Sequence, residues 1–416
     1  MNPTSHLAHY GGPKVRAEPF PARGHIGAEE KAAVGAFLDQ VIASGVLPSY
    51  DGDEEQAYCA EFAAWLGGGY ADAVSSGSAA VYVALKALDL EPFQEVIIGA
   101  FTDPGGIMPI PLQNLIPMIA DSMPNSYCTG PEQIEALISP LTAAIIVPHI
   151  AGEPADMPAI MALAQRHGIP VIEDCAQAHG AQINGQLAGS FGDLAAFSTM
   201  GGKHHSTGPQ GGVVYTRDEA RYHAVRRASD RGKPFFLPPG STNVTASLNF
   251  NLNDLAAAMG RVQLRKLPAS IERRRAIVGQ LQEGLADLAV VSIDPPRTGA
   301  ASSYWFLPLH FHADQASCDK ATFCDCLRAE GLPVMTDYRG GMPHTMDWFV
   351  HRRVFGHSGY PWASPDYQGD PQRTFPCPNA QAMVASHFNL MIHENWDSRA
   401  LDDAVAIFQK VATAFA

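Results

Sequence analysis

The sequence predicts an α/β protein with a mostly parallel sheet between helices, followed by a smaller α+β domain. Short β-branched runs end in polar residues, and the run Val171–Ile172 is followed by Glu173 and Asp174. A buried parallel strand brings a carboxylate to the carboxyl edge of its sheet in this way. Between such runs lie segments whose apolar residues recur at helical spacing. Of the 416 residues, 46% are hydrophobic, so the chain can bury a large core and form two domains.

The composition argues against several classes of partner. The chain carries 28 Lys and Arg against 42 Asp and Glu, a formal charge of −14, which disfavours binding to nucleic acid or an anionic membrane surface. No apolar run reaches the roughly 18 residues of a membrane span, and the N-terminus lacks the pattern of a secretion signal. The seven cysteines are scattered, and Cys324 and Cys326 are too close for a zinc-ribbon pair. We expect reduced thiols and a cytoplasmic protein.

We expect three parts along the chain. Residues 1–27 are rich in Gly, Pro and charge and are predicted to form an arm with little regular structure. A large domain over residues 28–290 and a small C-terminal domain over residues 291–416 are expected to follow. The large domain opens with two predicted helices, Ala28–Ser44 and Glu54–Leu66, and three glycines end the second one.

The next predicted strand, Ala71–Ser75, leads into a turn of small residues that contains Gly77 and Ser78, and then into a helix with one apolar face. A small-residue turn at a helix N-terminus offers unpaired N–H groups, the positive end of the helix dipole and hydroxyls, which together bind phosphate. The alternative is that Ser78 only caps its helix.

Further elements follow from apolar runs and helical spacing. Strands are expected at Glu95–Ile98, Ile116–Ala120, Ala143–Pro148 and Leu194–Phe197, and in the small domain at Tyr304–Phe306. Helices are expected at 157–167, Leu255–Leu264, Ile271–Leu285, Lys320–Glu330 and Asp397–Phe415. The second and third of these helices are predicted to be separate, with the break near Pro268. We expect Asp156 to be the N-cap of the helix at 157–167.

The segment after the strand Leu194–Phe197 carries the candidate chemistry. Ser198 ends the strand, and Lys203 follows in a loop of small residues whose glycines allow a close approach to a ligand. A carboxylate at a strand end, here Asp174, and a lysine in such a loop suit pyridoxal phosphate. The lysine forms a Schiff base, and the acid keeps the ring nitrogen protonated so that the ring acts as an electron sink. An ordinary strand followed by a surface loop would give the same pattern.

Three motifs carry a resemblance to a known family: E-D-x-A-Q-A-H-G from Glu173, G-S-F-G-D from Gly189, and F-S-x-x-x-x-K ending at Lys203. They resemble the DegT/DnrJ/EryC1/StrS family of sugar aminotransferases, which have the type I fold of pyridoxal-phosphate enzymes. The similarity extends from Gly11 to at least Gln263. It implies transfer of an amino group from glutamate or glutamine to a keto-sugar, free or nucleotide-linked, or to a keto-cyclitol, through a Lys203 aldimine.

The resemblance also implies roles for individual residues. Lys203 would carry the cofactor and Asp174 would pair with its pyridinium nitrogen, so both would be catalytic. Further cofactor contacts are implied for Gln177 at the ring hydroxyl, for Ser198 at the phosphate, and for Gly77 and Ser78, which match the S-G-T-x-A phosphate motif of the family.

A last motif implies a shared active site. The segment Ser247–Asn251 resembles the family's G-x-N-x-R, which crosses a dimer interface to the neighbour's phosphate. Asn249 matches this motif, whereas Asn251 replaces the arginine, so the arginine's contact is in doubt. Active sites built across a two-fold axis predict an obligate homodimer.

One departure from the family pattern affects the ring of the cofactor. The family commonly has an aromatic residue that stacks on the ring at the position where this chain has Asp103. Phe101 or His149 could cover the ring instead. The extra carboxylate at Asp103 could also recognise substrate hydroxyls or an ammonium group.

Two other functions fit parts of the sequence. Dehydratases that resemble this family have histidine at the lysine position, and a one-residue shift of the loop would place His204 there. A non-catalytic regulator that binds cofactor or ligand without turnover would be consistent with the loss of the ring aromatic at Asp103. The interval from Ser198 to Lys203 matches the lysine-bearing members and favours the aminotransferase.

Two clusters of polar residues have competing interpretations. A metal-dependent hydrolase could use the histidines His149, His179, His204 and His205, but no metal-ligand spacing supports this, and we expect no metal. The segment Arg226–Lys233 is a basic island in an acidic protein. It is either a solvated helix end or a site for an anion.

Overall fold

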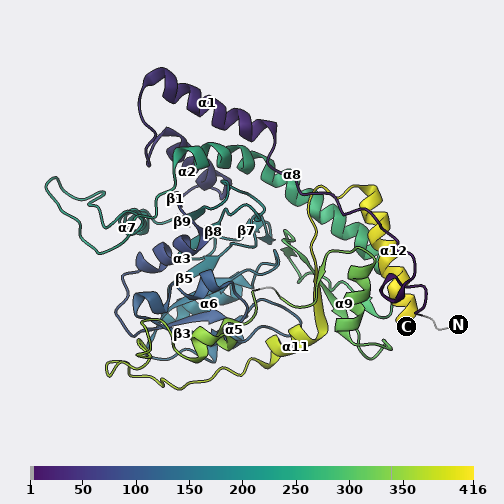
Figure 1. Cartoon of the computed structure of the whole chain (residues 1–416). Coiled ribbons are helices and arrows are strands. Elements are labelled where there is room, and N and C mark those ends of the chain that lie inside the picture. The colour runs from purple at the N-terminus through teal and green to yellow at the C-terminus, as the bar shows by residue number, and fades with distance from the viewer. Residues whose placement is uncertain (1–3, 339) are drawn as a thin grey trace.

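The computed structural model describes residues 4–338 and 340–416 and confirms the predicted α/β class (Figure 1). A seven-stranded sheet, in the order β1-β9-β8-β5-β4-β2-β3, forms the centre of the larger part. Its strands are β1 (Tyr70–Val74), β2 (Glu95–Gly99), β3 (Ile116–Ala120), β4 (Thr142–Pro148), β5 (Val171–Asp174), β8 (Leu194–Ser198) and β9 (Gly212–Thr216). The ladders are parallel except for those that β9 forms with its two neighbours. The strands predicted from apolar runs are therefore confirmed to within one or two residues.

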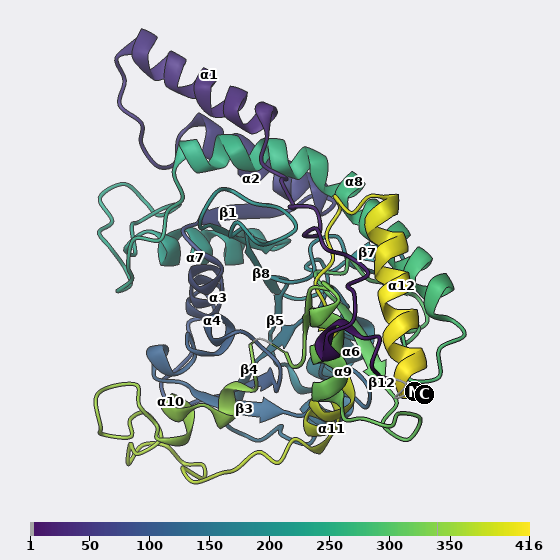
Figure 2. The same cartoon turned by 45° about the vertical axis from the view of Figure 1, so that its right-hand side comes forward.

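Helices pack against this sheet on both sides, with α3 on one side and α6 on the other (Figure 2). The helices of this part are α1 (Ala28–Ser44), α2 (Asp53–Trp65), α3 (Gly77–Lys86), α4 (Pro104–Ile107), α5 (Pro131–Glu135), α6 (Met157–His167), α7 (Glu219–Ser229) and α8 (Asp254–Leu285). Every residue of β2, β3 and β5 is buried, because both faces of a parallel sheet are covered by helices. Asp156 is the N-cap of α6, as predicted.

A second, antiparallel sheet lies in the C-terminal part, in the order β10-β12-β14-β13. Its strands are β10 (Val291–Ser292), β12 (Leu307–Phe311), β13 (Val334–Met335) and β14 (His387–Leu390). The helices after residue 290 are α9 (Lys320–Ala329), α10 (Asp347–Val350), α11 (Pro378–Ser386) and α12 (Ser398–Phe415). A small third sheet, in the order β11-β6-β7, joins Ala300–Ala301 to Gln182–Ile183 and Gln186–Leu187. No helix among the described residues is long and apolar enough to cross a membrane.

The N-terminal arm runs along the small sheet rather than the large one. In its described residues, the regular structure is one turn of 3-10 helix, Ala8–Tyr10. Leu7 is fully buried in the hydrophobic cluster that contains residues of the small sheet. The backbone N–H groups of Ala8 and Val15 donate to the Glu330 carboxylate at 2.8 and 2.9 Å. The arm thus lies against a hydrophobic core that is formed mainly by residues after 276.

The predicted break near Pro268 is wrong, because α8 is one helix of 32 residues with this proline inside it. A proline within a helix costs about 3 kcal/mol. Packing along the whole length offsets this cost: the first half contacts α1 and α2, and the second half contacts α12. Leu267 and Ile271, on either side of the proline, are both buried.

The strand predicted at Tyr304–Phe306 is also wrong, since β12 begins at Leu307. Tyr304 has a φ of 48°, in the left-handed region that interrupts a strand. The backbone N–H of Trp305 donates to the carbonyl of Ala151 at 2.9 Å. These contacts turn the three residues toward the large sheet and out of the small one.

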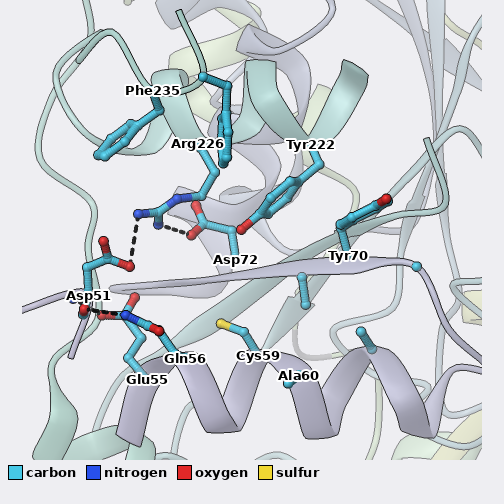
Figure 3. Close-up of a pocket in the computed structure, with 14 residues that line it drawn as sticks. Asp51, Glu55, Gln56, Cys59, Ala60, Tyr70, Asp72, Tyr222, Arg226 and Phe235 are labelled. Atoms are coloured by element: carbon cyan, nitrogen blue, oxygen red, sulfur yellow. Dashed lines mark hydrogen bonds and ion pairs between the residues drawn. The ribbon is translucent and has the colours of Figure 1, made fainter. Parts of the chain in front are cut away.

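Arg226, the first residue of the basic island, is buried and is therefore not part of a solvated helix end. Arg226 is 5% exposed and forms ion pairs with Asp72 on β1 and Asp51, the second at 3.2 Å (Figure 3). These residues line a cavity of about 540 Å³ between α2, β1 and α7. Farther along the island, Arg231 and Lys233 pair with Asp230 at 2.8 and 2.7 Å. Carboxylates therefore neutralise these cations, and the arrangement does not support the anion site.

We predict that Asp72→Ala lowers the free energy of unfolding by about 3 kcal/mol or more. The substitution leaves a buried guanidinium with the half-exposed Asp51 as its remaining partner, and breaking a buried ion pair from one side is strongly destabilising. Glu135→Ala is the control, because its ion pair with Arg166 is exposed and worth less than about 1 kcal/mol. Urea unfolding followed by circular dichroism measures both. Equal losses in the two variants would contradict the assignment.

Candidate active site

A cavity of about 240 Å³ opens where the turn before α3, the end of β5 and the loop after β8 meet. Parallel strands β5 and β8 are neighbours, so their carboxyl ends reach the same edge of the sheet. The lining residues are Ser76, Gly77, Ser78, Val81, Asp103, Gly105, Gly106, Asp174, Ala176, Ser198, Met200, Lys203 and Gln210. The structure thus brings together Gly77, Ser78, Asp174, Ser198 and Lys203, as the sequence predicted.

Lys203 lies in the loop after β8, and its backbone N–H donates to the carbonyl of Met200 at 2.9 Å. Its side chain is 7% exposed, and the indole ring of Trp305 lies 4.0 Å from Nζ. Burial lowers the pKa of the Lys203 amine, against the opposing charges of Asp174 and Asp103. The amine therefore loses its proton more readily than a lysine in water, which is what a nucleophilic lysine requires.

Asp174 is the last residue of β5 and lines the same cavity. One carboxylate oxygen, Oδ1, accepts a hydrogen bond from the backbone N–H of Ala176 at 3.0 Å. The other, Oδ2, lies so close to Gly106 that a Cβ on that residue would come within 2.9 Å of it. Burial raises the pKa of Asp174, although the N–H of Ala176 and the charge of Lys203 oppose this effect. A cation placed opposite this carboxylate would favour its charged form.

The turn before α3 is capped by Ser76 and not by Ser78. The hydroxyl of Ser76 accepts from the backbone N–H of Ala79 at 3.0 Å, because the helix begins two residues earlier than the capping alternative required. This leaves the hydroxyl of Ser78 at the cavity wall. A Cβ on Gly77 would lie 2.5 Å from that of Ser198, so only glycine allows the turn to approach the end of β8.

Two of the predicted cofactor contacts do not line this cavity. The side chain of Gln177 accepts from the N–H of Ala151 at 3.1 Å and donates to the hydroxyl of Tyr338 at 2.8 Å. Phe101 is buried, with its ring 4.8 Å from that of Tyr127 and 5.5 Å from that of Tyr338. Both residues therefore contact Tyr338 outside the cavity.

Asn249 lies at the surface of the chain, outside the cavity. Its side-chain oxygen accepts from the backbone N–H and the side-chain amide of Asn251, at 3.1 and 2.7 Å. The residue that replaces the family's arginine therefore holds Asn249 in place, although neither side chain reaches the cavity of its own chain.

His149 links the ends of two strands, and hydrogen bonds occupy both of its ring nitrogens. Its Nδ1 accepts from the backbone N–H of Ala155 at 3.0 Å, so Nε2 carries the proton and donates to Glu173 at 3.0 Å. The Glu173 carboxylate also accepts from the backbone N–H groups of residues 189, 191 and 192. His149 is 1% exposed and does not line the cavity, which leaves it a structural role.

The remaining histidines form a buried cluster beside the lysine loop. The ring of His179 lies 5.8 Å from the rings of both His204 and His205. Burial lowers the pKa of all three, that of His205 to about 4, so these rings are neutral. Nε2 of His204 is 3.0 Å from the carbonyl oxygen of Ser303, outside the cavity. Lys203, not His204, faces the cavity, which favours the aminotransferase over the dehydratase.

Trp305 is the site residue that the sequence did not predict. Its indole N–H donates to the carbonyl of Gly202 at 3.0 Å, beside Lys203. The buried side chain of Arg274 holds this segment in place by donating to the carbonyls of Tyr304 and Trp305, at 2.7 and 3.3 Å. Since Trp305 follows Lys203 by about 100 residues, no local motif in the sequence connects them.

Known proteins resemble this chain along most of its length. A family model described as the DegT/DnrJ/EryC1/StrS aminotransferase family matches residues 27–409. A Streptomyces kanamyceticus protein, provisionally named L-glutamine:3-amino-2,3-dideoxy-scyllo-inosose aminotransferase, is 31% identical over 80% of this chain and 79% of its own. The UDP-N-acetyl-3-dehydro-alpha-D-glucosamine 3-aminotransferase of Acidithiobacillus ferrooxidans is 37% identical over 66% of this chain and 70% of its own.

The fold has a close counterpart among solved structures. The aminotransferase from Psychrobacter cryohalolentis superposes with a TM-score of 0.80 at 25% identity, over 94% of this chain and 98% of that one. The match of the family model covers far more than half of the chain, and it includes the lysine loop, the end of β5 and the turn before α3. The protein therefore belongs to the DegT/DnrJ/EryC1/StrS aminotransferase family and is a pyridoxal-phosphate-dependent aminotransferase.

Proposed function

We propose that this aminotransferase moves the amino group of L-glutamine or L-glutamate to a keto-cyclitol or a keto-sugar, the latter free or nucleotide-linked. The observation that carries the proposal is the convergence of Lys203, Asp174 and the N-terminus of α3 on one cavity. The names of the relatives support both acceptor classes, since one refers to an inosose and another to a UDP-linked keto-sugar. The first of these names also favours glutamine as the donor.

The cavity fits pyridoxal phosphate at both of its ends. We assign the phosphate to the N-terminus of α3, where Gly77 and Ser78 offer first-turn N–H groups and a hydroxyl, and where Ser198 adds a second hydroxyl. We assign the ring nitrogen to Asp174, whose buried carboxylate gains a cationic partner there. When bound, pyridoxal phosphate supplies an electron sink for the electrons left at the α carbon of the donor.

Lys203 is assigned the proton transfer. Its Nζ would take the α proton of the donor and release it again in the first half-reaction, and in the second half-reaction the same atom would run these two transfers in reverse. Burial lowers the pKa of the amine, which makes it available as a base. The ring of Trp305, 4.0 Å from Nζ, shields the amine from water and limits its motion.

Asp103 is assigned to substrate recognition. Its carboxylate lines the cavity with Asp174 and Lys203, and its Oδ1 accepts from the backbone N–H of Gly105 at 2.9 Å. This bond caps α4 and fixes the direction of the side chain. We propose that the carboxylate accepts hydrogen bonds from the hydroxyl or ammonium groups of a polyhydroxylated acceptor.

We propose modified roles for the three other residues that were expected to contact the cofactor. Gln177 and Phe101 both contact Tyr338, so we assign them the support of the cavity wall from outside. Asn249 is assigned to the phosphate of a second chain in a homodimer, which its exposed position on its own chain allows.

We also propose that the enzyme works in the cytoplasm. All seven cysteines are free thiols, and five of them are buried. Unpaired cysteines in this number are typical of a reducing compartment. Secretion of the protein with intact function into an oxidising medium would contradict this location.

We predict that the protein sediments as a dimer. Ile42, Leu47 and Leu248 are 79%, 83% and 63% exposed, and large apolar side chains of this kind are normally covered in a functional assembly. Sedimentation velocity of the purified enzyme measures its mass. Leu248→Asp should weaken the dimer and lower activity with it, because Asn249 reaches the second chain. A fully active monomer would rule out shared active sites.

We predict that L-glutamine or L-glutamate bleaches the yellow absorbance of the loaded enzyme in the absence of an acceptor. Bleaching is expected because the donor would displace Lys203, and without an acceptor the first half-reaction could not be reversed by a second one. Lys203→Ala should lack both the yellow absorbance and the bleaching, while Lys14→Ala, which changes an exposed lysine of the arm, should behave as wild type. Persistent absorbance with both donors would point to a dehydratase, a regulator or another donor.

The same absorbance can be used to identify the class of ketone that accepts the amino group. The bleached enzyme is mixed with scyllo-inosose and, separately, with a UDP-linked 3-keto-sugar. Return of the absorbance identifies the ketone that takes the amino group. If neither ketone restores it after complete bleaching, the acceptor part of the proposal fails while the donor part stands.

We predict that Asp174→Asn keeps the cofactor but slows the donor half-reaction by roughly 100-fold. The ring nitrogen loses a buried ionic partner worth about 3 kcal/mol, which corresponds to a factor of this size. Asp156→Asn is the control, since asparagine caps a helix as well as aspartate does and Asp156 lies outside the cavity. Stopped-flow absorbance measures the rates. A near wild-type rate in Asp174→Asn would mean that another carboxylate faces the ring.

A further inference from the structure

We propose that the small sheet carries a binding site for a divalent transition metal, with zinc as the preferred ion. Asp294, His310 and His387 form this site. The site is separate from the catalytic cavity, and none of its three ligands lines that cavity. The side chains come from two neighbouring strands of the sheet and from the segment that follows a third.

The sheet places two of the ligands opposite each other. His310 on β12 and His387 on β14 are register partners in an antiparallel ladder, so their side chains leave the same face. Their ring centroids lie 4.6 Å apart with an interplanar angle of 28°. His312, the residue directly after β12, stacks on His310 with ring centroids 4.3 Å apart. The three imidazoles therefore lie in a row.

Asp294, two residues after the end of β10, completes the group. Its Oδ2 is 3.0 Å from Nε2 of His387, and its Oδ1 is 3.7 Å from Nδ1 of His310. One ligand atom from each of the three residues lies within 4.8 Å of the other two. In a tetrahedral zinc site with bonds of about 2.0–2.1 Å, neighbouring ligand atoms are roughly 3.4 Å apart. Small side-chain rotations are therefore sufficient to bind the ion.

A second contact orients the buried ligand. Nδ1 of His387 is 2.9 Å from the hydroxyl of Ser386, which leaves Nε2 directed at Asp294. Partners of this kind at the far nitrogen are typical of metal-binding histidines. The side chains of His310 and Asp294 are 25% and 38% exposed, so an ion can enter from solvent and keep a water as a fourth ligand.

The types of ligand atom at the site determine which metal ion it prefers. Two imidazoles and one carboxylate favour zinc and its neighbours in the transition series, whereas Mg²⁺ and Ca²⁺ prefer oxygen ligands alone. A second convergent group, His149, Glu173 and Cys175, is less suitable. Both ring nitrogens of His149 are engaged, and Glu173 already accepts three backbone N–H bonds, so an ion there would break existing bonds.

Binding of the ion would fasten the segment after β10 to the rest of the small sheet. That segment continues to Arg297, whose guanidinium lies 3.6 Å from Glu153 and 3.7 Å from Asp156, both outside the small sheet. We therefore expect zinc to raise the midpoint of thermal unfolding in a concentration-dependent way, because the ion binds the folded chain.

The test uses the cofactor-loaded enzyme after treatment with a chelator and dialysis. Isothermal titration with ZnCl₂ should give one ion per chain, and CoCl₂ should give the visible absorption of tetrahedral cobalt. His310→Ala and Asp294→Asn should weaken zinc binding at least tenfold and abolish the cobalt spectrum. His351→Ala is the control, since it removes an exposed histidine at the end of α10, and it should bind as wild type.

Three results would overturn the proposal. One is the absence of a zinc isotherm in the wild type. Another is an isotherm that His310→Ala and His351→Ala share equally, which would mean an adventitious ion only. The third is cobalt absorption that is octahedral in the wild type. Donor bleaching by the loaded enzyme does not enter this test, so the metal site and the proposed reaction stand or fall separately.

Discussion

The arrangement of the active site depends on one buried guanidinium. Arg274 is 2% exposed and sits on α8, where it forms an ion pair with Glu394 at 2.7 Å and donates to the carbonyls of Tyr304 and Trp305. A guanidinium has five donors in a rigid plane, so it can hold several acceptors in one geometry. Through these bonds a helix fixes the loop that presents an indole to Lys203. Arg274 therefore positions the reacting amine through Trp305, without a direct contact to Lys203.

The chemistry of the cavity follows from the order of the strands. Because β5 and β8 are adjacent and parallel, Asp174 and Ser198 meet at one edge, and the loop after β8 returns Lys203 between them. Burial then moves the two pKa values in opposite directions, raising that of Asp174 and lowering that of Lys203. Each group is thereby kept closer to its neutral form until a charged ligand enters. The same environment suits the carboxylate to a pyridinium and the amine to a carbonyl.

Structural features that depend on local sequence patterns could be predicted from the sequence, whereas features that depend on packing between distant residues could not. Asp174 is visible in the sequence because an apolar run stops at it, and Lys203 because it lies in a loop of small residues after the next such run. The continuation of α8 through Pro268 depends on neighbours far along the chain, and so does the ion pair that buries Arg226. Trp305 could not be assigned, because only the folded chain brings it to the lysine loop. The family pattern implied a cofactor contact for Gln177, and Phe101 was expected to replace the missing ring aromatic, but neither residue lines the cavity.

The continuous helix α8 has a consequence for how the molecule unfolds. Its buried side chains belong to two hydrophobic cores: Leu264 and Leu267 pack with the large sheet, and Ile277 and Leu281 pack with the small one. When the helix melts on one side of the boundary between the two cores, the adjacent turn on the other side loses hydrogen bonds that stabilise it. The helix α8 therefore couples the unfolding of the two hydrophobic cores. The chain is expected to lose both cores in one transition, even though each core surrounds a sheet of its own.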